Sequence, residues 1–245
     1  AEGDALGGGT RIERHLDLPL PELIGFAFNA FGKTGQDARD ELETFFHDRL
    51  VGYLRVLTNL EQSGVEYVTS EELGAAARVS AHQVRKDLVH AEASGTRGRG
   101  YTVAILRREL SSLLGLTRHW NVAIVGMGRL GQALVDYPYF QNYNFRLRCG
   151  FDTAPAKAGK QIGELPVYDL ARLSEQVAEQ KLDIAFLTVP VAAAQGAADA
   201  LVAAGIRGIL NFTPTVLQVP PSVRVEPIDF VAGLKRLAYY LQPQE

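Results

Sequence analysis

Residues 41–117 have a helical pattern of hydrophobic and polar positions, whereas residues 1–40 have none. A run of apolar side chains spaced three and four residues apart predicts an amphipathic helix that ends at Gly64. The residues of this run are Leu50, Tyr53, Leu54, Leu57 and Leu60. The start of the chain is glycine-rich and holds an apolar stretch over residues 23–31. We expect a partly flexible extension there, with room for one short helix.

Two shorter helices are predicted next, because each follows a capping sequence. Thr69 stands three residues before Glu72, and Ser80 stands three residues before Gln83, as in a capping box. The helices would cover about residues 70–77 and 81–92, with a tight turn between them. This spacing is typical of a helix-turn-helix, whose second helix enters the major groove of DNA. The glycine-punctuated basic turn that follows, residues 95–101, would be the wing of a winged helix.

The second half of the chain alternates short apolar runs with helical patterns. Strands are predicted over 121–125, 145–151, 183–190, 206–212 and 223–225, and helices over 170–180, 191–204 and 230–241. Alternating strands and helices predict a parallel sheet wound on both faces. Ligands then bind outside the carboxyl ends of the strands, where Thr188, Val189, Pro190, Asn211 and Phe212 are expected.

The first of these strands leads into a Rossmann fingerprint. Gly126, Gly128 and Gly131 form a G-x-G-x-x-G motif, and Asp152 follows 21 residues after the last glycine. Gly126 would permit the tight turn, Gly128 the approach of a pyrophosphate, and Gly131 close helix–strand packing, with the helix N-terminus facing the phosphates. Asp152 would bind the adenosine ribose and repel a 2′-phosphate. The sequence therefore predicts a dinucleotide site that favours NAD over NADP.

Composition adds constraints on location and on metal sites. The chain of 245 residues has a net charge of −3 and a single cysteine, Cys149. One cysteine excludes an intramolecular disulfide and a multi-cysteine metal site, so we predict no metal and a cytoplasmic location. No apolar run is long enough to span a membrane, and no signal peptide is recognisable. Within the acidic chain, residues 78–108 carry seven basic residues against two acidic ones, a local patch suited to DNA phosphates.

Several function classes remain open from the residues alone. An NAD-dependent oxidoreductase needs a proton donor or acceptor near the nicotinamide, yet no histidine follows His119. Lys235 and Tyr137 have no obvious acidic partner. A module that binds CoA is a third reading, because similar folds bind CoA. A DNA-binding half joined to a nucleotide-binding half without catalytic groups favours a sensor over an enzyme.

Five motifs occur in an order that resembles the Rex family of redox-sensing transcriptional repressors, and most of all its Thermus–Deinococcus members. They are Gln83-Val84-Arg85-Lys86-Asp87-Leu88, Gly95-Thr96-Arg97-Gly98, Val125-Gly126-Met127-Gly128-Arg129-Leu130-Gly131, Leu187-Thr188-Val189-Pro190 and Gly208-Ile209-Leu210-Asn211-Phe212-Thr213-Pro214. The resemblance covers about residues 47–241. It implies a homodimer that binds an A/T-rich palindromic operator and leaves it when NADH binds. It also implies that the C-terminal helix is exchanged between subunits.

The resemblance also implies roles for individual residues. Tyr137 would report on the nicotinamide of the other subunit, while Arg55 and Asp229 would pair in one state of the switch. DNA would be contacted by His82, Gln83, Arg85 and Lys86 in the major groove and by Thr96, Arg97, Gly98 and Arg99 of the wing. NADH or NAD⁺ would be bound by Gly126, Gly128, Arg129, Leu130, Gly131, Asp152, Thr188, Val189, Pro190, Asn211, Phe212 and Tyr137.

We therefore expect four segments: an extension (1–46), a winged helix-turn-helix (47–117), a Rossmann domain (118–228) and a swapped helix (229–245). The chain departs from the family between Leu88 and Gly95, where aromatic residues and glycines are usual. Here Glu92 adds a negative charge near the DNA, and Arg99 stands in place of a usual valine. These departures put the path of the wing in doubt.

Overall fold

The computed structural model describes residues 35–242 except 94 and 97, and divides the chain into two compact units, Ala1–Thr117 and Arg118–Glu245. The apolar stretch over residues 23–31 lies outside the described residues. No helix of the described part is long and apolar enough to cross a membrane. In the same part of the chain, no group of three or more His, Cys, Asp or Glu side chains could hold a metal ion.

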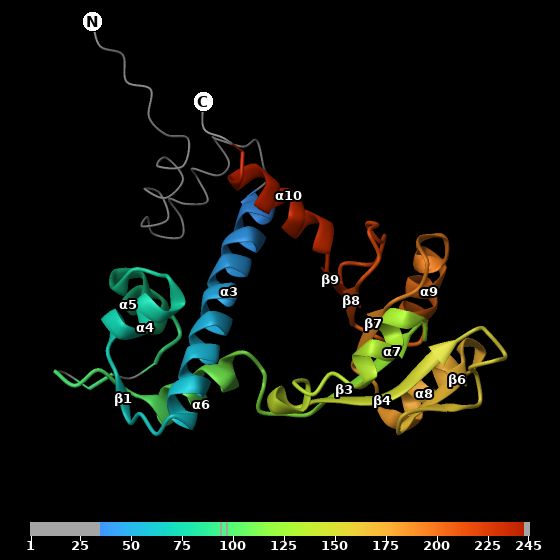
Figure 1. The fold of residues 1–245 in the computed structure, drawn as a ribbon, viewed down its shortest axis with the longest axis horizontal. Coiled ribbons are helices and arrows are strands. Elements are labelled where there is room, and N and C mark those ends of the chain that lie inside the picture. The colour runs from blue at the N-terminus through green and yellow to red at the C-terminus, as the bar shows by residue number, and fades with distance from the viewer. Residues whose placement is uncertain (1–34, 94, 97, 243–245) are drawn as a thin grey trace, which may run out of the picture. The chain divides into compact units, whose positions relative to one another are not determined.

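The first unit is a small helical domain with a two-stranded sheet. Its elements are α3 (Gly35–Gln62), β1 (Tyr67–Val68), α4 (Ser70–Ala77), α5 (Ala81–His90), β2 (Tyr101–Thr102) and α6 (Val103–Leu113). Helix α3 packs against α4 and α6, and α4 packs against α5 (Figure 1). Helix α3 begins at Gly35, whereas the sequence pattern assigned residues 35–46 to the extension. Residues 35–46 are mostly polar, so they lack the apolar spacing from which a helix is predicted.

The predicted helix-turn-helix is confirmed, and both helices begin where the sequence placed them, but only the first of the two predicted capping boxes forms, because the Gln83 side chain donates to Asp87 instead. Helix α4 begins after Thr69, whose side chain and that of Glu72 form a reciprocal capping box. Helix α5 begins after Ser80, whose hydroxyl accepts from the Gln83 backbone N–H at 3.1 Å. Helix α5 ends at His90, two residues before the predicted end, because Glu92 adopts the left-handed region (φ 54°). The hydrophobic core of this unit lies between α3, α4, α5 and α6, and includes Leu57, Leu73, Leu88 and Leu106.

The second unit has a seven-stranded sheet in the order β5-β6-β4-β3-β7-β8-β9. The strands are β3 (Trp120–Val125), β4 (Phe145–Asp152), β5 (Gln161–Ile162), β6 (Leu165–Asp169), β7 (Ile184–Leu187), β8 (Gly208–Asn211) and β9 (Arg224–Pro227). Six of them are parallel, and β5 alone pairs antiparallel, with β6. In chain order the parallel strands have the 3-2-1-4-5-6 arrangement of a Rossmann fold. The α/β fold class is therefore confirmed, although β5 and β6 were not predicted.

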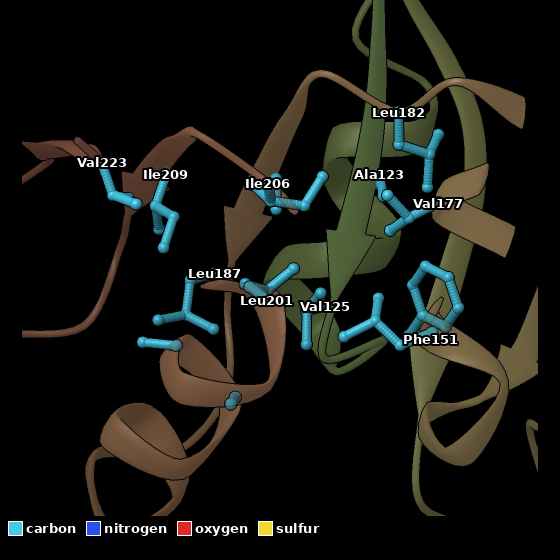
Figure 2. Close-up of a cluster of buried hydrophobic side chains, with 14 of the residues drawn as sticks. Ala123, Val125, Phe151, Val177, Leu182, Leu187, Leu201, Ile206, Ile209 and Val223 are labelled. Atoms are coloured by element: carbon cyan, nitrogen blue, oxygen red, sulfur yellow. The ribbon is translucent and has the colours of Figure 1, made fainter. Parts of the chain in front are cut away.

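Helices cover the two faces of this sheet. They are α7 (Arg129–Val135), α8 (Leu173–Gln180) and α9 (Val191–Ala203), and α10 (Phe230–Tyr240) ends the described chain. Figure 2 shows the larger core, where Val177 of α8 and Leu201 of α9 meet Val125, Phe151 and Leu187 of the strands. A second core lies on the other face, and the partly buried Leu134 and Val135 of α7 pack against it. Cys149 is fully buried in the larger core, and burial raises the pKa of its thiol to about 12.

Candidate dinucleotide and nucleic-acid sites

The glycine-rich turn between β3 and α7 is locked against the end of β7. Gly126 has φ +98°, and a Cβ there would lie 2.8 Å from the carbonyl of Thr188. The Thr188 hydroxyl donates to the Gly126 carbonyl at 2.7 Å. A side chain at Gly131 would collide with the same Gly126 carbonyl. Gly126 and Gly131 thus build the turn itself.

Gly128 differs from these two glycines because a Cβ there would meet nothing within 4 Å. Its backbone (φ −74°, ψ −164°) is one that any residue can adopt. The fold itself therefore does not require a glycine at this position. The lack of a side chain instead keeps the space in front of the turn open. Such a space fits the pyrophosphate of a dinucleotide, whose close approach needs a glycine. Arg129 and Leu130, at the start of α7, are exposed beside it.

Asp152 closes the same turn from the end of β4. One carboxylate oxygen accepts from the Met127 N–H at 3.0 Å and from Lys157 Nζ at 2.9 Å, and the other accepts from the Ala154 N–H at 2.8 Å. Burial disfavours the charged carboxylate, but these three donors outweigh it and lower the pKa of Asp152. The carboxylate is thus ionised and fixed where the fingerprint expects a ribose. The residues present fit the adenosine end of a dinucleotide.

At the end of β8, Asn211 is buried and organises the following loop. Its amide oxygen accepts from the Thr213 N–H at 3.0 Å and from the Thr213 hydroxyl at 2.6 Å, and its amide nitrogen donates to the Thr215 carbonyl at 2.9 Å. Because these bonds occupy the side chain, Asn211 positions the loop that carries Phe212. Val189 and Pro190 lie in the corresponding loop after β7. A Cβ added at Gly126 would collide with the side chain of Val189.

An aromatic row joins the Phe212 loop to Tyr137. Ring centroids lie 5.9 Å apart for Phe186 and Phe212, 5.2 Å for Phe140 and Phe186, and 4.9 Å for Tyr137 and Phe140. These distances are typical of tilted aromatic pairs. Packed aromatic rings therefore connect the loop that carries Phe212 with the loop that carries Tyr137, and both residues belong to the predicted site.

Tyr137 itself lies at the far end of α7 from the glycine turn. Asp136 comes eight positions after Gly128, which is about 12 Å along a helix at 1.5 Å per residue, and Tyr137 follows it. The ring is half exposed and borders a cavity of about 710 Å³ that is also lined by Phe140, Arg146 and Glu164. The structure thus does not bring Tyr137 to the glycine turn of its own subunit.

In the winged helix, one face of α5 is turned outward. Four of the predicted contacts lie on this helix, and the structure divides them: His82, Arg85 and Lys86 are exposed, whereas Gln83 is half-buried. Arg85 donates to the Ser70 hydroxyl at 2.9 Å and to Glu71 at 2.8 Å. Because this ion pair is exposed, it is weak, and a DNA phosphate can replace it.

The inward face of α5 is fixed to α3 by a buried carboxylate. Asp87 is only 3 % exposed and accepts from Arg49 Nε at 2.6 Å and Arg49 Nη2 at 2.8 Å. It also accepts from the Tyr53 hydroxyl at 2.7 Å and from the Gln83 amide at 2.8 Å. Burial and the Asp87 hydrogen bond raise the pKa of Tyr53, so its hydroxyl stays protonated as a donor. The network thus fixes both the recognition helix and the Gln83 side chain.

The wing is a tight turn that leads from α5 into β2. Thr96 N–H donates to the Gly100 carbonyl at 2.7 Å, and Gly98 and Gly100 adopt positive φ angles of 78° and 86°. The Arg99 guanidinium lies 4.0 Å from the ring centroid of Tyr67. Arg97, the predicted minor-groove contact, lies outside the described residues. Among the described residues of the wing, Thr96 and residues 98–100 form a short turn, and Arg99 is stacked on Tyr67.

The two predicted switch residues lie on different units. Arg55 is exposed on α3. Asp229 is exposed at the start of α10, where one carboxylate oxygen accepts from the Val231 N–H at 2.8 Å and the Ala232 N–H at 3.0 Å. Asp229 is thus the N-cap of α10, and no described contact within one subunit assigns it a second partner.

Comparison with known proteins finds matches to both units of the chain. A family described as "Putative DNA-binding protein N-terminus" matches residues 47–88, and a "CoA binding domain" family matches residues 117–215. The redox-sensing transcriptional repressor Rex of Thermus thermophilus is 53 % identical over 191 residues, which cover 78 % of this chain and 90 % of that protein. The chain belongs to the Rex family. The Rex of Deinococcus radiodurans is 46 % identical over 79 % of this chain and 90 % of its own length.

Solved structures of a Rex-family repressor, RSP, have the same fold. The complex of RSP with beta-NAD+ and operator DNA has a TM-score of 0.77 at 36 % identity, and covers 81 % of this chain and 91 % of RSP. The complex of RSP with beta-NADH has a TM-score of 0.72 at 36 % identity, and covers 80 % and 92 %. The resemblance found in the five sequence motifs is therefore confirmed.

Sequence reasoning missed two parts of this Rex-family chain's candidate sites. The Asp87 network was missed because Arg49 and Tyr53 are 38 and 34 residues away and only folding brings them together. Lys157 was missed although it stands five residues after Asp152. A basic residue shortly after the acid predicted to bind the ribose is the signal that could have indicated it.

Proposed function

We propose that this chain is a redox-sensing transcriptional repressor, not an enzyme, that binds A/T-rich palindromic operator DNA and is released when NADH binds. The proposal is supported by two surfaces in one Rex-family chain, one suited to DNA and one suited to a dinucleotide. One is the exposed face of α5 with His82, Arg85 and Lys86; the other is the turn of Gly128 and Asp152. We further propose that it acts in the cytoplasm, where such DNA is found.

Each unit has a defined role in this function. Arg85 and Lys86 contact bases and phosphates in the major groove, while Gln83 and Thr96, Gly98 and Arg99 of the wing complete the interface. Asp152 accepts ribose hydroxyl groups, and Gly128, Arg129 and Leu130 face the pyrophosphate. Thr188 to Pro190, Asn211 and Phe212 form the nicotinamide end. The bound nicotinamide takes part in no reaction here. The protein distinguishes NADH from NAD⁺ by the charge and shape of the nicotinamide ring.

Release requires that NADH prefers the geometry of the dimer that cannot hold DNA. We propose that Tyr137 senses the nicotinamide of the other subunit and that Arg55 and Asp229 pair between subunits in one of the two geometries. The position of Tyr137 beyond the end of α7 supports a contact across the dimer. The aromatic row from Phe212 to Tyr137 supplies a packed connection between the two loops.

A gel-shift experiment tests this function. A duplex with an A/T-rich palindrome should be retarded by the protein with or without NAD⁺, and the retarded band should disappear as NADH is added. A duplex of the same length and base composition with the palindrome scrambled is the control. DNA binding that is unaffected by NADH contradicts the sensing role, and equal binding of both duplexes contradicts the operator role.

The homodimer is proposed from helix α10. Phe230, Leu234 and Leu237 recur on this helix with 66 %, 63 % and 58 % exposed surface, respectively, at spacings of four and three residues that place them on one face. No residue of α10 is buried. A helix with such an apolar face is stable only when something covers it, and we propose that a second copy of this chain does so.

Replacing Leu237 with Glu should convert the dimer to a monomer, because a charge in a buried apolar interface costs several kcal/mol. Analytical ultracentrifugation measures the change, and affinity for a palindrome should fall while affinity for a half-site remains. Lys235→Glu changes charge on the same helix away from the Phe230–Leu237 row and serves as the control. A Leu237→Glu protein that sediments as a dimer contradicts the assignment of α10 to the interface.

A further inference from the structure

An exposed arginine of the recognition helix α5 is held by the first turn of α4. Arg85 Nη1 donates to the Ser70 hydroxyl at 2.9 Å and to Glu71 Oε1 at 2.8 Å. The Ser70 hydroxyl in turn donates to Glu71 Oε2 at 3.4 Å. The three side chains thus form a closed ring of hydrogen bonds that joins the two helices.

The α4 side of this ring is fixed in place. Ser70 is only 8 % exposed, and the capping box of Thr69 and Glu72 fixes the backbone of the turn that carries Ser70 and Glu71. A hydrogen bond from its own backbone N–H and the Arg85 guanidinium lower the pKa of Glu71, so its carboxylate is charged at neutral pH. The Arg85 side chain is therefore held by a fixed anion.

The ring leaves one edge of the guanidinium for a ligand. In the described part of the chain, the hydrogen bonds of Arg85 all come from Nη1, whereas an arginine has five N–H donors on three nitrogens. Nε and Nη2 together form an edge that can make a bidentate contact, for instance to O6 and N7 of guanine in the major groove. An arginine whose Nη1 is held in place is already oriented for such a contact.

DNA without the operator sequence meets the same arginine differently. Its contacts are made to phosphates, which attract a positive charge whatever its orientation. A phosphate can use Arg85 only after it displaces the Glu71 carboxylate. On the operator, by contrast, the seated helix covers the ion pair, and the exclusion of water strengthens it. Glu71 therefore favours binding that uses the orientation of Arg85 and opposes binding that uses only its charge.

We propose that Glu71 is a positioning residue for operator recognition, which orients Arg85 for a bidentate contact to a guanine base and lowers the affinity for other DNA. The inference rests on the proposed function, since it concerns the same DNA-binding surface. It gives the acidic first turn of α4 a role in sequence selection, although Glu71 itself makes no contact to a base.

Glu71→Gln tests this role because it removes the charge and keeps the size of the side chain. Fluorescence anisotropy gives the dissociation constants for the A/T-rich palindrome and for the scrambled duplex of equal length and base composition. Affinity for the palindrome should fall and affinity for the scrambled duplex should rise. The ratio of the two affinities should fall about tenfold, within the range that one bidentate base contact provides. On the scrambled duplex, the salt slope should steepen by about one, because Arg85 then contacts a phosphate.

Glu72→Gln is the matched control, because it removes the same charge one residue away. The Glu72 carboxylate accepts from the Thr69 N–H and hydroxyl rather than from Arg85, and glutamine also serves in a capping box. This variant should change both affinities alike and leave their ratio constant. In an Arg85→Gln background, Glu71→Gln should likewise leave the ratio constant, because the side chain it positions is gone.

The direction of the two shifts decides between the possible roles of Glu71. A purely structural role lowers both affinities, and a role through charge alone raises both. The proposal is overturned if Glu71→Gln moves both affinities in the same direction or leaves their ratio unchanged. An unmodified chain that binds both duplexes equally instead contradicts the proposed function.

Discussion

Gly128→Ala should leave the protein folded but lower its NADH affinity by roughly 10- to 100-fold, the worth of a hydrogen bond to a charged group. The added Cβ meets no protein atom within 4 Å, so stability should change by less than about 0.5 kcal/mol. It does, however, occupy the space in front of the turn, and the pyrophosphate can no longer reach the backbone. Fluorescence titration with NADH measures the loss, and thermal unfolding measures the stability.

The same variant should separate DNA binding from sensing. It should bind the operator as the unmodified chain does, yet remain bound at NADH concentrations that release the unmodified chain. Gly196→Ala, in α9, adds a Cβ that also meets nothing within 4 Å but lies away from the glycine turn. It should retain NADH affinity. Normal NADH affinity in Gly128→Ala would place the pyrophosphate elsewhere.

Asp87→Ala should destabilise the winged-helix unit by about 3–5 kcal/mol, the usual cost of breaking a buried ion pair. Removal of the carboxylate takes away the acceptor of Arg49, Tyr53 and Gln83 together. The recognition helix then loses its polar connection to α3. Operator binding should be lost, whereas NADH should still bind the second unit, because none of these residues belongs to it.

Denaturant unfolding followed with and without NADH measures this effect, since NADH stabilises only the unit that binds it. Asp48→Ala is the matched control: it removes the same charge from an exposed position next to Arg49 on α3 and should change stability by less than about 0.5 kcal/mol. A conservative Asp87→Asn variant should retain part of the network and an intermediate stability. If Asp87→Ala binds operator like the unmodified chain, the network does not position the recognition helix.

The features that sequence predicted well are those encoded over a few neighbouring residues. Thr69 and Glu72 form the capping box their spacing indicates, and Gly126 and Gly131 make the close contacts the fingerprint requires. Each depends on backbone geometry within one turn, so the residue types and their spacing are sufficient.

The features that sequence missed depend on contacts made only in the folded chain or on weak local signals. Strand β6 is short and contains Pro166, which lowers its strand signal, and its buried Leu165 and Val167 take meaning only beside β4. Gln83 is predicted to contact DNA, and the sequence alone did not show that its amide also donates to the buried Asp87. The spacing of four residues places Gln83 and Asp87 on the same face of α5, but only the folded chain shows that Arg49 and Tyr53 of α3 also hold this carboxylate.

The burial of Cys149 determines which cellular signal such a protein can receive. Burial raises the pKa of the Cys149 thiol to about 12, so the reactive thiolate is scarce at neutral pH. Peroxide attacks thiolates, and Cys149 is the only cysteine in the chain, so oxidants have almost no direct route into the protein through a thiol. The repressor would therefore respond to the ratio of NADH to NAD⁺ in the cell and not to peroxide.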